Sequence, residues 1–335
     1  MPSVRITERT CNATEWPRRD RESPLITIAV PAFNRPCLLA EALASIAAQT
    51  SQVPIEVIVC DDGRMRETRA VVERFPGETF VYLPNPVTLG AVGNWNRCLE
   101  AARGEWVMVL HEDDALYPWY LDCVLPYLHS DAAAVCMMTS RGPVQPKERC
   151  PRADPPAVAY PPRYFLKSSM TPFPGVLIRR DVALHLGGFD ERWGPLADYE
   201  FWYRLACAGR IDVVRAVGAF YRVAPGQWTE RIWGRMLGLT HLLRLRIARE
   251  QFPNNRRAGR WLARFFTYGN ARRYALRFGA GPEILRRCLQ LCRGPVAALP
   301  NGWVWQALKF ASRPARPHLE LAPDAGRTPQ IQQSG

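Results

Sequence analysis

Three consecutive carboxylates, Glu112, Asp113 and Asp114, follow an apolar stretch of the sequence at residues 106–110. Adjacent carboxylates repel one another unless a cation or a set of hydrogen-bond donors offsets their charge. A hard divalent cation such as Mg²⁺ or Mn²⁺ is the simplest such partner, and a cation with only one or two protein carboxylates usually also binds phosphate oxygens. The cluster therefore predicts a divalent metal site that binds a nucleoside diphosphate.

A second pair of carboxylates, Asp61 and Asp62, follows the β-branched run at residues 55–60. Taken singly, either group of acids could instead cap a helix or remain solvated. The sequence contains neither the GxxxxGK(S/T) pattern nor a strand followed by GxGxxG, so a P-loop and a dinucleotide-binding turn are both excluded. The metal is therefore expected to hold the phosphates.

The elements around these acids alternate between strand and helix. Apolar runs predict strands at residues 25–33, 55–61, 80–85 and 106–111, and apolar residues at helical spacing predict helices at 35–49, 67–75 and 94–104. Such alternation is typical of a mostly parallel sheet with helices on both faces. Ligands bind these sheets outside the carboxyl ends of the strands, so both groups of acids are expected to line one crevice of a Rossmann-like α/β domain.

The sequence predicts four regions. Residues 1–23 form a polar, flexible leader, residues 24–227 the α/β domain, residues 228–311 a basic helical region and residues 312–335 a disordered tail. Within the α/β domain, residues 141–163 contain seven prolines in 23 positions, a composition that resists helix interiors and central strands. This segment is predicted to be a long loop, either disordered or folded over the crevice.

Basic residues concentrate in the C-terminal part of the chain. The formal net charge is +13, yet residues 1–228 contain 25 basic and 26 acidic residues, whereas residues 229–335 contain 19 basic and 5 acidic ones. Arginines alternate there with apolar residues, including the aromatic residues Trp233, Trp261, Phe265, Phe266 and Tyr268. Such amphipathic helices could lie on an anionic membrane surface or pack as a bundle on the α/β domain. No nucleic-acid recognition motif is present, so nucleic acid is not an expected partner.

Composition also bears on localisation. No apolar stretch approaches the roughly 20 residues of a membrane-spanning helix, and the charged N-terminus lacks the apolar core of a signal peptide. The ten cysteines are scattered, which is typical of reduced thiols, and Cys288 and Cys292 have no further ligand nearby to complete a zinc site. We therefore expect a cytoplasmic protein, peripheral on the inner face of the cell membrane if the basic helices bind lipid.

Four segments resemble, in order and spacing, the motifs of family 2 glycosyltransferases, which have the GT-A fold. They are VPAFNRP, VCDDG, LGAVGNWNRCLEAARGEWVMVLHEDDAL and GGFDERWGPLADYEFWYRLACAG, and together they cover about residues 24–225. The resemblance implies transfer of a sugar from a nucleoside-diphosphate sugar to an acceptor hydroxyl, in one inverting displacement assisted by Mg²⁺ or Mn²⁺. UDP- and dTDP-linked donors are favoured, and the acceptor would be a glycan, a lipid-linked glycan or a natural product, in polysaccharide, glycolipid or glycoside assembly.

The resemblance also implies which residues bind the donor. The first motif lines the nucleotide pocket, Asp62 contacts the pyrimidine base with Asp61 beside it, and the third motif packs under the donor. The implied nucleotide-sugar-binding residues are Pro31, Ala32, Phe33, Asn34, Arg35, Asp61, Asp62, Gly90, Asn94, Asn96 and Asp113.

The metal ligands implied by the resemblance are Asp113 and Asp114. Asp114 is expected to bind the metal directly, and Asp113 to contact the ribose or to make a second contact. His111 occupies the position at which a further Asp often precedes this pair. Histidine can bind Mn²⁺ but is a poor ligand for Mg²⁺, so the preferred metal stays open, and His111 could equally be hydrogen-bonded in the core.

An inverting displacement needs a base that removes the proton from the acceptor hydroxyl. The resemblance places this base at Asp198, although Ala197 stands where relatives often have a second acid. The sequence LADYEFWYRLACAG at residues 196–209 predicts a helix that contains both Asp198 and Glu200. Glu200 lies on another side of this helix, where it is structural or positions the acceptor. Trp193 and Trp202 could stack on the face of an acceptor sugar or belong to the core.

Two other classes of protein share features with this sequence. A non-catalytic scaffold could keep the fold and dock through its basic C-terminal helices, but it has no need of Asp198 together with Asp62, Asp113 and Asp114. A sugar-nucleotide pyrophosphorylase could share the sheet, but it would have a glycine-rich phosphate loop where this chain has PAFNRP. A glycosyltransferase is the leading interpretation and the scaffold the alternative.

Overall fold

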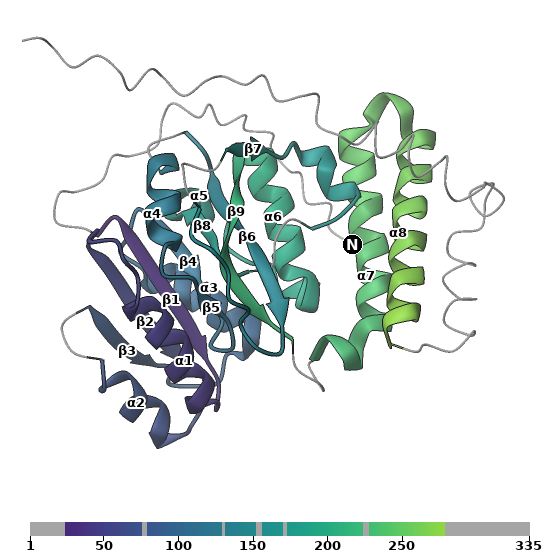
Figure 1. The fold of residues 1–335 in the computed structure, drawn as a ribbon. Helices are drawn as coiled ribbons and strands as arrows, with labels where there is room; N and C mark the ends of the chain where they lie inside the picture. The colour runs from purple at the N-terminus through teal and green to yellow at the C-terminus, as the bar shows by residue number, and fades with distance from the viewer. Residues whose placement is uncertain are drawn as a thin grey trace, which may run out of the picture.

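A computed structural model describes residues 24–75, 79–128, 131–151, 156–169, 173–223 and 228–278. In this part of the chain strands and helices alternate, as the sequence predicts (Figure 1). The strands are β1 (Ile26–Ala32), β2 (Ile55–Asp61), β3 (Phe80–Pro84), β4 (Trp106–Val109), β5 (Ala115–Leu116), β6 (Ala134–Gly142), β7 (Ala157–Ala159), β8 (Val176–Arg179) and β9 (Ile211–Arg222). The α-helices are α1 (Pro36–Ala47), α2 (Arg66–Val72), α3 (Gly90–Ala101), α4 (Tyr120–Val124), α5 (Arg180–His185), α6 (Ala197–Ala208), α7 (Trp228–Gln251) and α8 (Arg256–Phe278), and the 3-10 helices are η1 (Leu125–Tyr127), η2 (Pro162–Leu166), η3 (Glu191–Leu196) and η4 (Pro253–Asn255). The predicted leader, residues 279–311 of the basic region with Cys288 and Cys292, and the predicted tail lie outside the described residues.

The nine strands of the described residues form one mixed sheet. Eight of them lie in the order β3-β2-β1-β4-β8-β6-β9-β5, and β7 pairs with β9. The pairings among β1, β2, β3 and β4 are parallel, whereas β8 is antiparallel to both of its neighbours, β4 and β6. β6 and β9 are parallel to each other. The predicted α/β class is confirmed, but the sheet is more mixed than predicted because β8, β5 and β7 each run opposite to their partners.

Helices cover both faces of the sheet. Side chains of a strand point alternately to its two faces, and along β1 Ile28 and Val30 belong to one apolar cluster whereas Ala29 belongs to the other. The cluster with Ile28 includes apolar residues of α1, α2 and α4, and the cluster with Ala29 includes those of α3, α5 and α6. The sheet is therefore the middle of three layers, which is why its central strands are apolar along their length.

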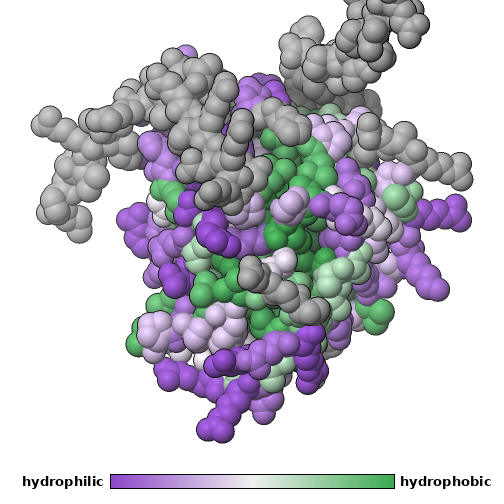
Figure 2. All heavy atoms as spheres, turned by 90° about the vertical axis from the view of Figure 1, so that its left-hand side faces the viewer, coloured by the Kyte–Doolittle hydropathy of each residue, from purple (hydrophilic) through white to green (hydrophobic). Residues whose placement is uncertain are grey.

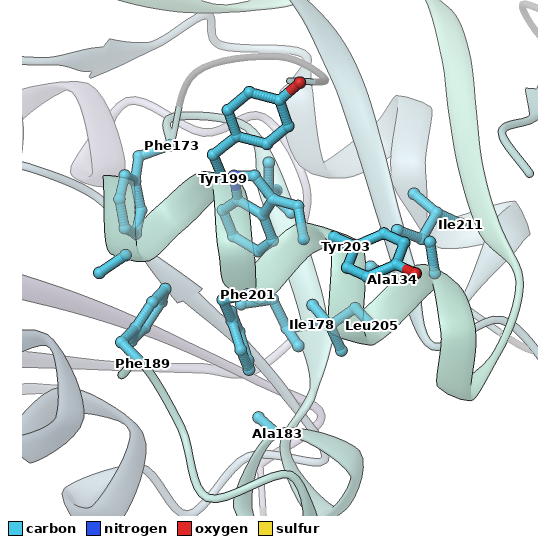
Figure 3. Packing of buried hydrophobic residues seen from close by; sticks show 14 of the residues in the cluster. Ala134, Phe173, Ile178, Ala183, Phe189, Tyr199, Phe201, Tyr203, Leu205 and Ile211 are labelled. Atoms are coloured by element: carbon cyan, nitrogen blue, oxygen red, sulfur yellow. The ribbon is translucent and has the colours of Figure 1, made fainter. Parts of the chain in front are cut away.

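Aromatic side chains anchor α6 on the sheet (Figure 3). Phe201 and Trp202 of this helix pack against Phe173 and Phe189, with ring centroids between 4.4 and 6.1 Å apart. These four side chains belong to the same buried cluster. Their packing fixes the helix whose first turn contains Asp198.

The proline-rich segment is more regular than predicted. β6 extends into it as far as Gly142, β7 lies within it and η2 begins in it at Pro162, so the predicted loop is wrong for these residues. β7 is a three-residue strand between Pro156 and Pro161 that pairs with β9. Proline has no amide hydrogen to donate, so a short edge strand is the β-structure that a proline-rich sequence tolerates. Residues 143–151 have no helix or strand.

α7 and α8 lie side by side and pack on the α/β domain (Figure 1). Leu243 and Ile247 of α7 and Phe265 and Phe266 of α8 are buried in the same cluster as the apolar residues of α6. In the described part of this region the helices pack as a bundle, and Phe265 and Phe266, two of the five aromatic candidates for lipid insertion, form core contacts. Among the described residues, no helix is long and apolar enough to cross a membrane.

An ion-pair network joins α6 to α7. The Glu200 side chain is 1% exposed, and its carboxylate accepts hydrogen bonds from Arg204 and from Arg246 of α7, each at 2.8 Å. Arg204 also donates to the carbonyls of Leu186 and Gly188. One buried carboxylate thus bridges two guanidinium groups, of which Arg246 also pairs with Glu250, and it holds the loop before η3 through Arg204.

We expect Glu200→Ala to lower the free energy of unfolding by about 3 kcal/mol, because removal of one partner leaves buried charge uncompensated. Glu73→Ala is the matched control, since the pair between Glu73 and Arg69 has the same i,i+4 spacing but side chains 60% and 68% exposed. An exposed pair contributes less than about 1 kcal/mol. Urea denaturation of both variants measures the difference, and equal losses would show that the Glu200 network contributes no more than a surface pair.

Candidate functional site

The carboxyl ends of six strands lie at one edge of the sheet. β1 to β4 are parallel to one another, and because β8 is antiparallel to both β4 and β6, β6 and β9 run in the same direction as β1. The predicted donor-binding and metal-binding residues lie at the ends of β1, β2, β3 and β4 or in the segments that follow them. This edge is the place at which α/β sheets bind ligands.

Arg35, three residues beyond β1, neutralises part of the acidic cluster (Glu112, Asp113 and Asp114). Its Nε donates to Glu112 at 2.7 Å and its Nη1 to Asp113 at 2.9 Å. Both oxygens of Glu112 are occupied, because the Phe33 amide donates to the second at 2.9 Å. Burial raises the pKa of Glu112, and the charge of Arg35 opposes that shift. Glu112 therefore links the end of β4 to the end of β1. Asp113 is more exposed than Glu112 and Asp114.

Asp114 is buried beside Arg222, the last residue of β9. Asp114 is 2% exposed, its Oδ1 accepts a hydrogen bond from the Arg222 amide at 3.0 Å, and its Oδ2 is buried without a hydrogen-bond partner. Burial, and then the charge of Asp113, raises the pKa of Asp114 well above its usual range. The Arg222 guanidinium donates to the Asp113 carbonyl at 2.9 Å and to Glu41 at 2.5 Å. One oxygen of Asp114 is thus held by backbone, and the other is available to a cation.

His111 belongs to an aromatic stack next to the acidic cluster. Its ring centroid lies 5.4 Å from that of Trp95 and 4.5 Å from that of Phe173. Its Nε2 is buried without a hydrogen-bond partner, and burial lowers the pKa of His111 to about 4, so the ring is neutral at pH 7. A ring nitrogen of His111 and one carboxylate oxygen each from Asp113 and Asp114 lie within 4.8 Å of one another. Among the described residues, these three form the set that could hold a metal.

Asp61 and Asp62 hold the backbone around the site. Asp62 is buried, and its carboxylate accepts hydrogen bonds from the amides of Leu89 and Gly90 at 2.7 and 2.8 Å, where α3 begins. A negative charge is favourable at a helix N-terminus. Asp61 accepts a hydrogen bond from the Tyr82 hydroxyl at 2.7 Å. Both carboxylates therefore have partners within the protein, and contact of Asp62 with a base stays a prediction.

Gly90, Asn94 and Asn96 shape the turn and helix after β3. Gly90 has a φ of +77°, which glycine adopts without strain. Asn94 is buried, and its side-chain amide donates to the Cys60 carbonyl at 2.9 Å. Asn96 exchanges two hydrogen bonds with the backbone of Phe189, at 2.7 and 2.9 Å. The two asparagines thus support the site through backbone contacts, and their contact with the donor stays a prediction.

The remaining residues of the first motif form the end of β1 and the turn after it. Pro31 and Ala32 are the last residues of β1, in register with Cys60 and Asp61 of β2. Asn34 has a φ of 55°, and its Oδ1 accepts a hydrogen bond from the Arg64 amide at 3.0 Å. The turn therefore packs on the loop after β2, so that the two strand ends form one continuous surface.

Exposed apolar side chains lie on the loops at this edge. Phe33 is 52% exposed, and Met65, Val87 and Leu89 on the loops after β2 and β3 are also exposed. The face of the molecule toward which β3 lies has apolar side chains at its surface, bordered by hydrophilic ones (Figure 2). Aromatic and aliphatic side chains at a surface provide contact area for a planar base.

Asp198 is the second residue of α6. Its charge and the charges of the acidic cluster act on the same side chain, Tyr221 of β9. The Tyr199 amide donates to Asp198 Oδ1 at 2.6 Å, and burial raises the pKa of Asp198 to about 6. Burial and the charges of Asp114, Asp113 and Asp198 together raise the pKa of Tyr221 to about 12. The three carboxylates are thus all within electrostatic range of the Tyr221 phenol. The roles of Asp198 as base and of Asp113 and Asp114 as metal ligands stay predictions.

Two predicted acceptor-binding residues do not face the site. Trp202 is fully buried in the aromatic core, and the Glu200 carboxylate is occupied by Arg204 and Arg246. Of the alternatives for these residues, the structure therefore supports the core for Trp202 and a structural role for Glu200. Trp193 of η3 is partly buried, and its role stays a prediction.

Arg141, Tyr221 and Arg222 join the site, although no sequence motif singled them out. The Arg141 guanidinium lies 5.6 Å from the centroid of the Tyr221 ring, because the two residues are partners in the β6–β9 ladder. The apolar run VGAFYRV at residues 217–223 predicts a strand, which is the end of β9. The sequence does not show that this strand pairs with β6, because the two strands lie far apart in the sequence.

Comparisons with known proteins agree with this geometry. The family described as Glycosyl transferase family 2 matches residues 27–187. An uncharacterized glycosyltransferase of Haemophilus influenzae is 26% identical over 194 residues, which is 54% of this chain and 62% of the relative, so the match spans about three fifths of that relative.

Two solved structures share the fold. TarS of S. aureus in complex with UDP-GlcNAc has a TM-score of 0.59 at 16% identity, over 80% of each chain. The mannosyltransferase PcManGT from Pyrobaculum calidifontis in complex with GDP-Man and Mn²⁺ has a TM-score of 0.53 at 19% identity, over 87% of this chain and 85% of that one. Residues 27–187 therefore match the family 2 glycosyltransferases, and the described part of the chain has the GT-A fold that its sequence predicts.

Proposed function

We propose that the protein is an inverting glycosyltransferase that transfers a sugar from a nucleoside-diphosphate sugar to an acceptor hydroxyl with the assistance of a divalent cation. The observation that carries the proposal is the geometry of the acidic cluster at the strand ends, where oxygens of Asp113 and Asp114 lie within 4.8 Å of each other and Asp114 Oδ2 is buried without a hydrogen-bond partner. A single displacement requires a base and a group that neutralises the leaving diphosphate around the same reacting atoms.

Asp198 acts as the base in this proposal. Its carboxylate takes the proton of the acceptor hydroxyl while the hydroxyl oxygen attacks the anomeric carbon, and the bond from that carbon to the diphosphate breaks on the opposite face. A pKa of about 6 leaves Asp198 ionised at pH 7 but still basic enough to accept a proton. The Tyr199 amide fixes one carboxylate oxygen, so the other is free to face the acceptor.

Asp113 and Asp114 would hold the cation. The residues fit such an ion because Asp114 Oδ2 is buried without a hydrogen-bond partner and because a cation offsets the repulsion between the two acids. When bound, a divalent ion neutralises charge on the leaving diphosphate. Arg35, half-exposed and already bonded to Asp113, provides a second positive group for phosphate oxygens.

A UDP- or dTDP-linked donor is favoured, as the resemblance implies. The fold shared with TarS, whose structure contains UDP-GlcNAc, supports a uridine nucleotide. The exposed apolar residues Phe33 and Leu89 at the strand ends offer contact area for its base. The acceptor is a hydroxyl of a glycan, a lipid-linked glycan or a natural product.

Arginines exposed on α7 and α8 support association with an anionic membrane surface, through charge rather than insertion. They are Arg235, Arg249, Arg256, Arg257, Arg260, Arg272 and Arg273. Basic side chains near an anionic surface each contribute about 1 kcal/mol, so this association would weaken with added salt.

Asp198→Asn tests the base. The variant keeps the oxygen that accepts from the Tyr199 amide, so we expect donor binding to remain and the transfer rate to fall by about a thousandfold. Isothermal titration with UDP and Mn²⁺ measures the first quantity, and single-turnover transfer measures the second. Transfer at the wild-type rate would show that another group removes the proton.

The pH dependence of kcat/KM tests the same assignment without a mutation. Because Asp198 must lose its proton to act as a base and its pKa is about 6, we expect kcat/KM to rise with pH through this value and then level off. Below pH 6 the slope of log kcat/KM should approach about one per pH unit. A profile that stays flat from pH 5 to pH 7 would exclude Asp198.

Asp113→Asn and Asp114→Asn test the metal ligands. Each keeps the size of the side chain but removes its charge, so the stabilisation by UDP that depends on Mn²⁺ should be lost. Saturation to about 100 times the Kd stabilises a protein by about 2.7 kcal/mol, which a thermal-shift measurement resolves. Asp131→Asn is the control, since Asp131 is an exposed acid before the amino end of β6. A metal-dependent shift that survives in both site variants would contradict the assignment.

A further inference from the structure

We infer that His111 is a third protein ligand of the metal and that it makes this site select Mn²⁺ over Mg²⁺, an inference that rests on the proposed function. The resemblance places only Asp113 and Asp114 in the metal site. The structure adds His111 by geometry, through the positions of its ring nitrogens and of the groups around them.

The three candidate ligand atoms are close enough to share one ion. A ring nitrogen of His111 and oxygens of Asp113 and Asp114 all lie within 4.8 Å of one another. Two ligands on opposite sides of an octahedral ion, each at about 2.1 Å, are about 4.2 Å apart, and two adjacent ligands are about 3.0 Å apart. Coordination by all three atoms therefore requires them to move closer, which the partly exposed Asp113 side chain allows by rotation.

Unsatisfied polar atoms mark this place as a binding site. Asp114 is 2% exposed, and its Oδ2 has no hydrogen-bond partner. The Nε2 of His111 is also buried without a hydrogen-bond partner. A buried polar atom without a partner costs about 1–3 kcal/mol, and an ion coordinated by this cluster would offset part of that cost.

Of the two side chains next to Asp113 and Asp114 in the cluster, Glu112 and His111, only His111 is suited to be the third ligand. Glu112 cannot serve, because Arg35 and the Phe33 amide occupy its two carboxylate oxygens. The ring of His111 is stacked near Trp95, with an interplanar angle of 21°, and against Phe173, so its orientation is fixed before a metal binds. A pre-oriented ligand loses little entropy on coordination.

An imidazole ligand changes which metal the site prefers. Mg²⁺ favours oxygen ligands in a nearly ideal octahedron, whereas imidazole is a good ligand for transition-metal ions. An Asp at position 111 would give an all-oxygen site suited to both ions. The histidine therefore shifts the preference toward Mn²⁺.

Pulsed electron paramagnetic resonance of Mn²⁺ bound to the full chain tests the inference. The protein is stripped of metal with a chelator and loaded with Mn²⁺ alone and with Mn²⁺ and UDP. We expect coupling to a ¹⁴N nucleus in the wild type and its loss in His111→Phe, which keeps an aromatic ring in the stack with Trp95. His185→Phe is the matched control, because His185 is an exposed histidine on α5, and it should keep the coupling.

Titration calorimetry with each metal gives the second readout. We expect His111→Phe to weaken Mn²⁺ binding about tenfold or more while Mg²⁺ binding changes little, and His111→Asp to bring the affinities for the two ions together.

Bound Mn²⁺ with oxygen ligands only would overturn the inference, and the proposed function would stand if Mn²⁺ still supported transfer. Transfer that continues in excess chelator would overturn the inference and the metal step of the proposed function together.

Discussion

Carboxylates gathered at the end of a buried sheet repel one another unless positive charge or hydrogen-bond donors offset their charge, and here two arginines supply both. Arg35 forms ion pairs with the acidic cluster from the end of β1, and Arg222 donates hydrogen bonds to it from the end of β9. These strands lie in different halves of the sheet, so the two arginines couple the halves at the edge where the donor is expected. The cluster keeps one unsatisfied carboxylate oxygen, which is the property that suits it to a metal ion.

Buried polar side chains around the cluster position loops through backbone hydrogen bonds. Asp62 binds the start of α3, Asn96 binds the loop that carries Phe189, and Glu200 holds Arg204 against the carbonyls before η3. Buried polar groups in proteins are normally hydrogen-bonded. Each of these contacts therefore satisfies a buried side chain and also fixes the position of a loop. Together with the aromatic packing of α6, they hold Asp198 relative to the sheet.

The helices α7 and α8 contain both apolar and basic side chains, and the two kinds of side chain lie in different places. Its apolar side chains, such as Ile247 and Phe266, extend the core of the α/β domain, while most of its arginines remain at the surface. Arg246 does both, because it reaches from α7 to the buried Glu200 carboxylate. The pair is therefore part of the folded domain, and its charge is left for interactions with anionic partners.

The sequence by itself determined the elements that local patterns encode. Alternation and helical spacing predicted β1 to β4 and the helices between them, and the acids that follow β2 and β4 predicted the edge at which the site lies, because side-chain periodicity is a property of neighbouring residues. Only the tertiary structure decided that β8 runs between β4 and β6, that β9 brings Tyr221 and Arg222 to the acids, and that Trp202 and Glu200 turn away from them. These outcomes depend on strand pairing and burial between residues far apart in the sequence, for which a single sequence carries no local signal.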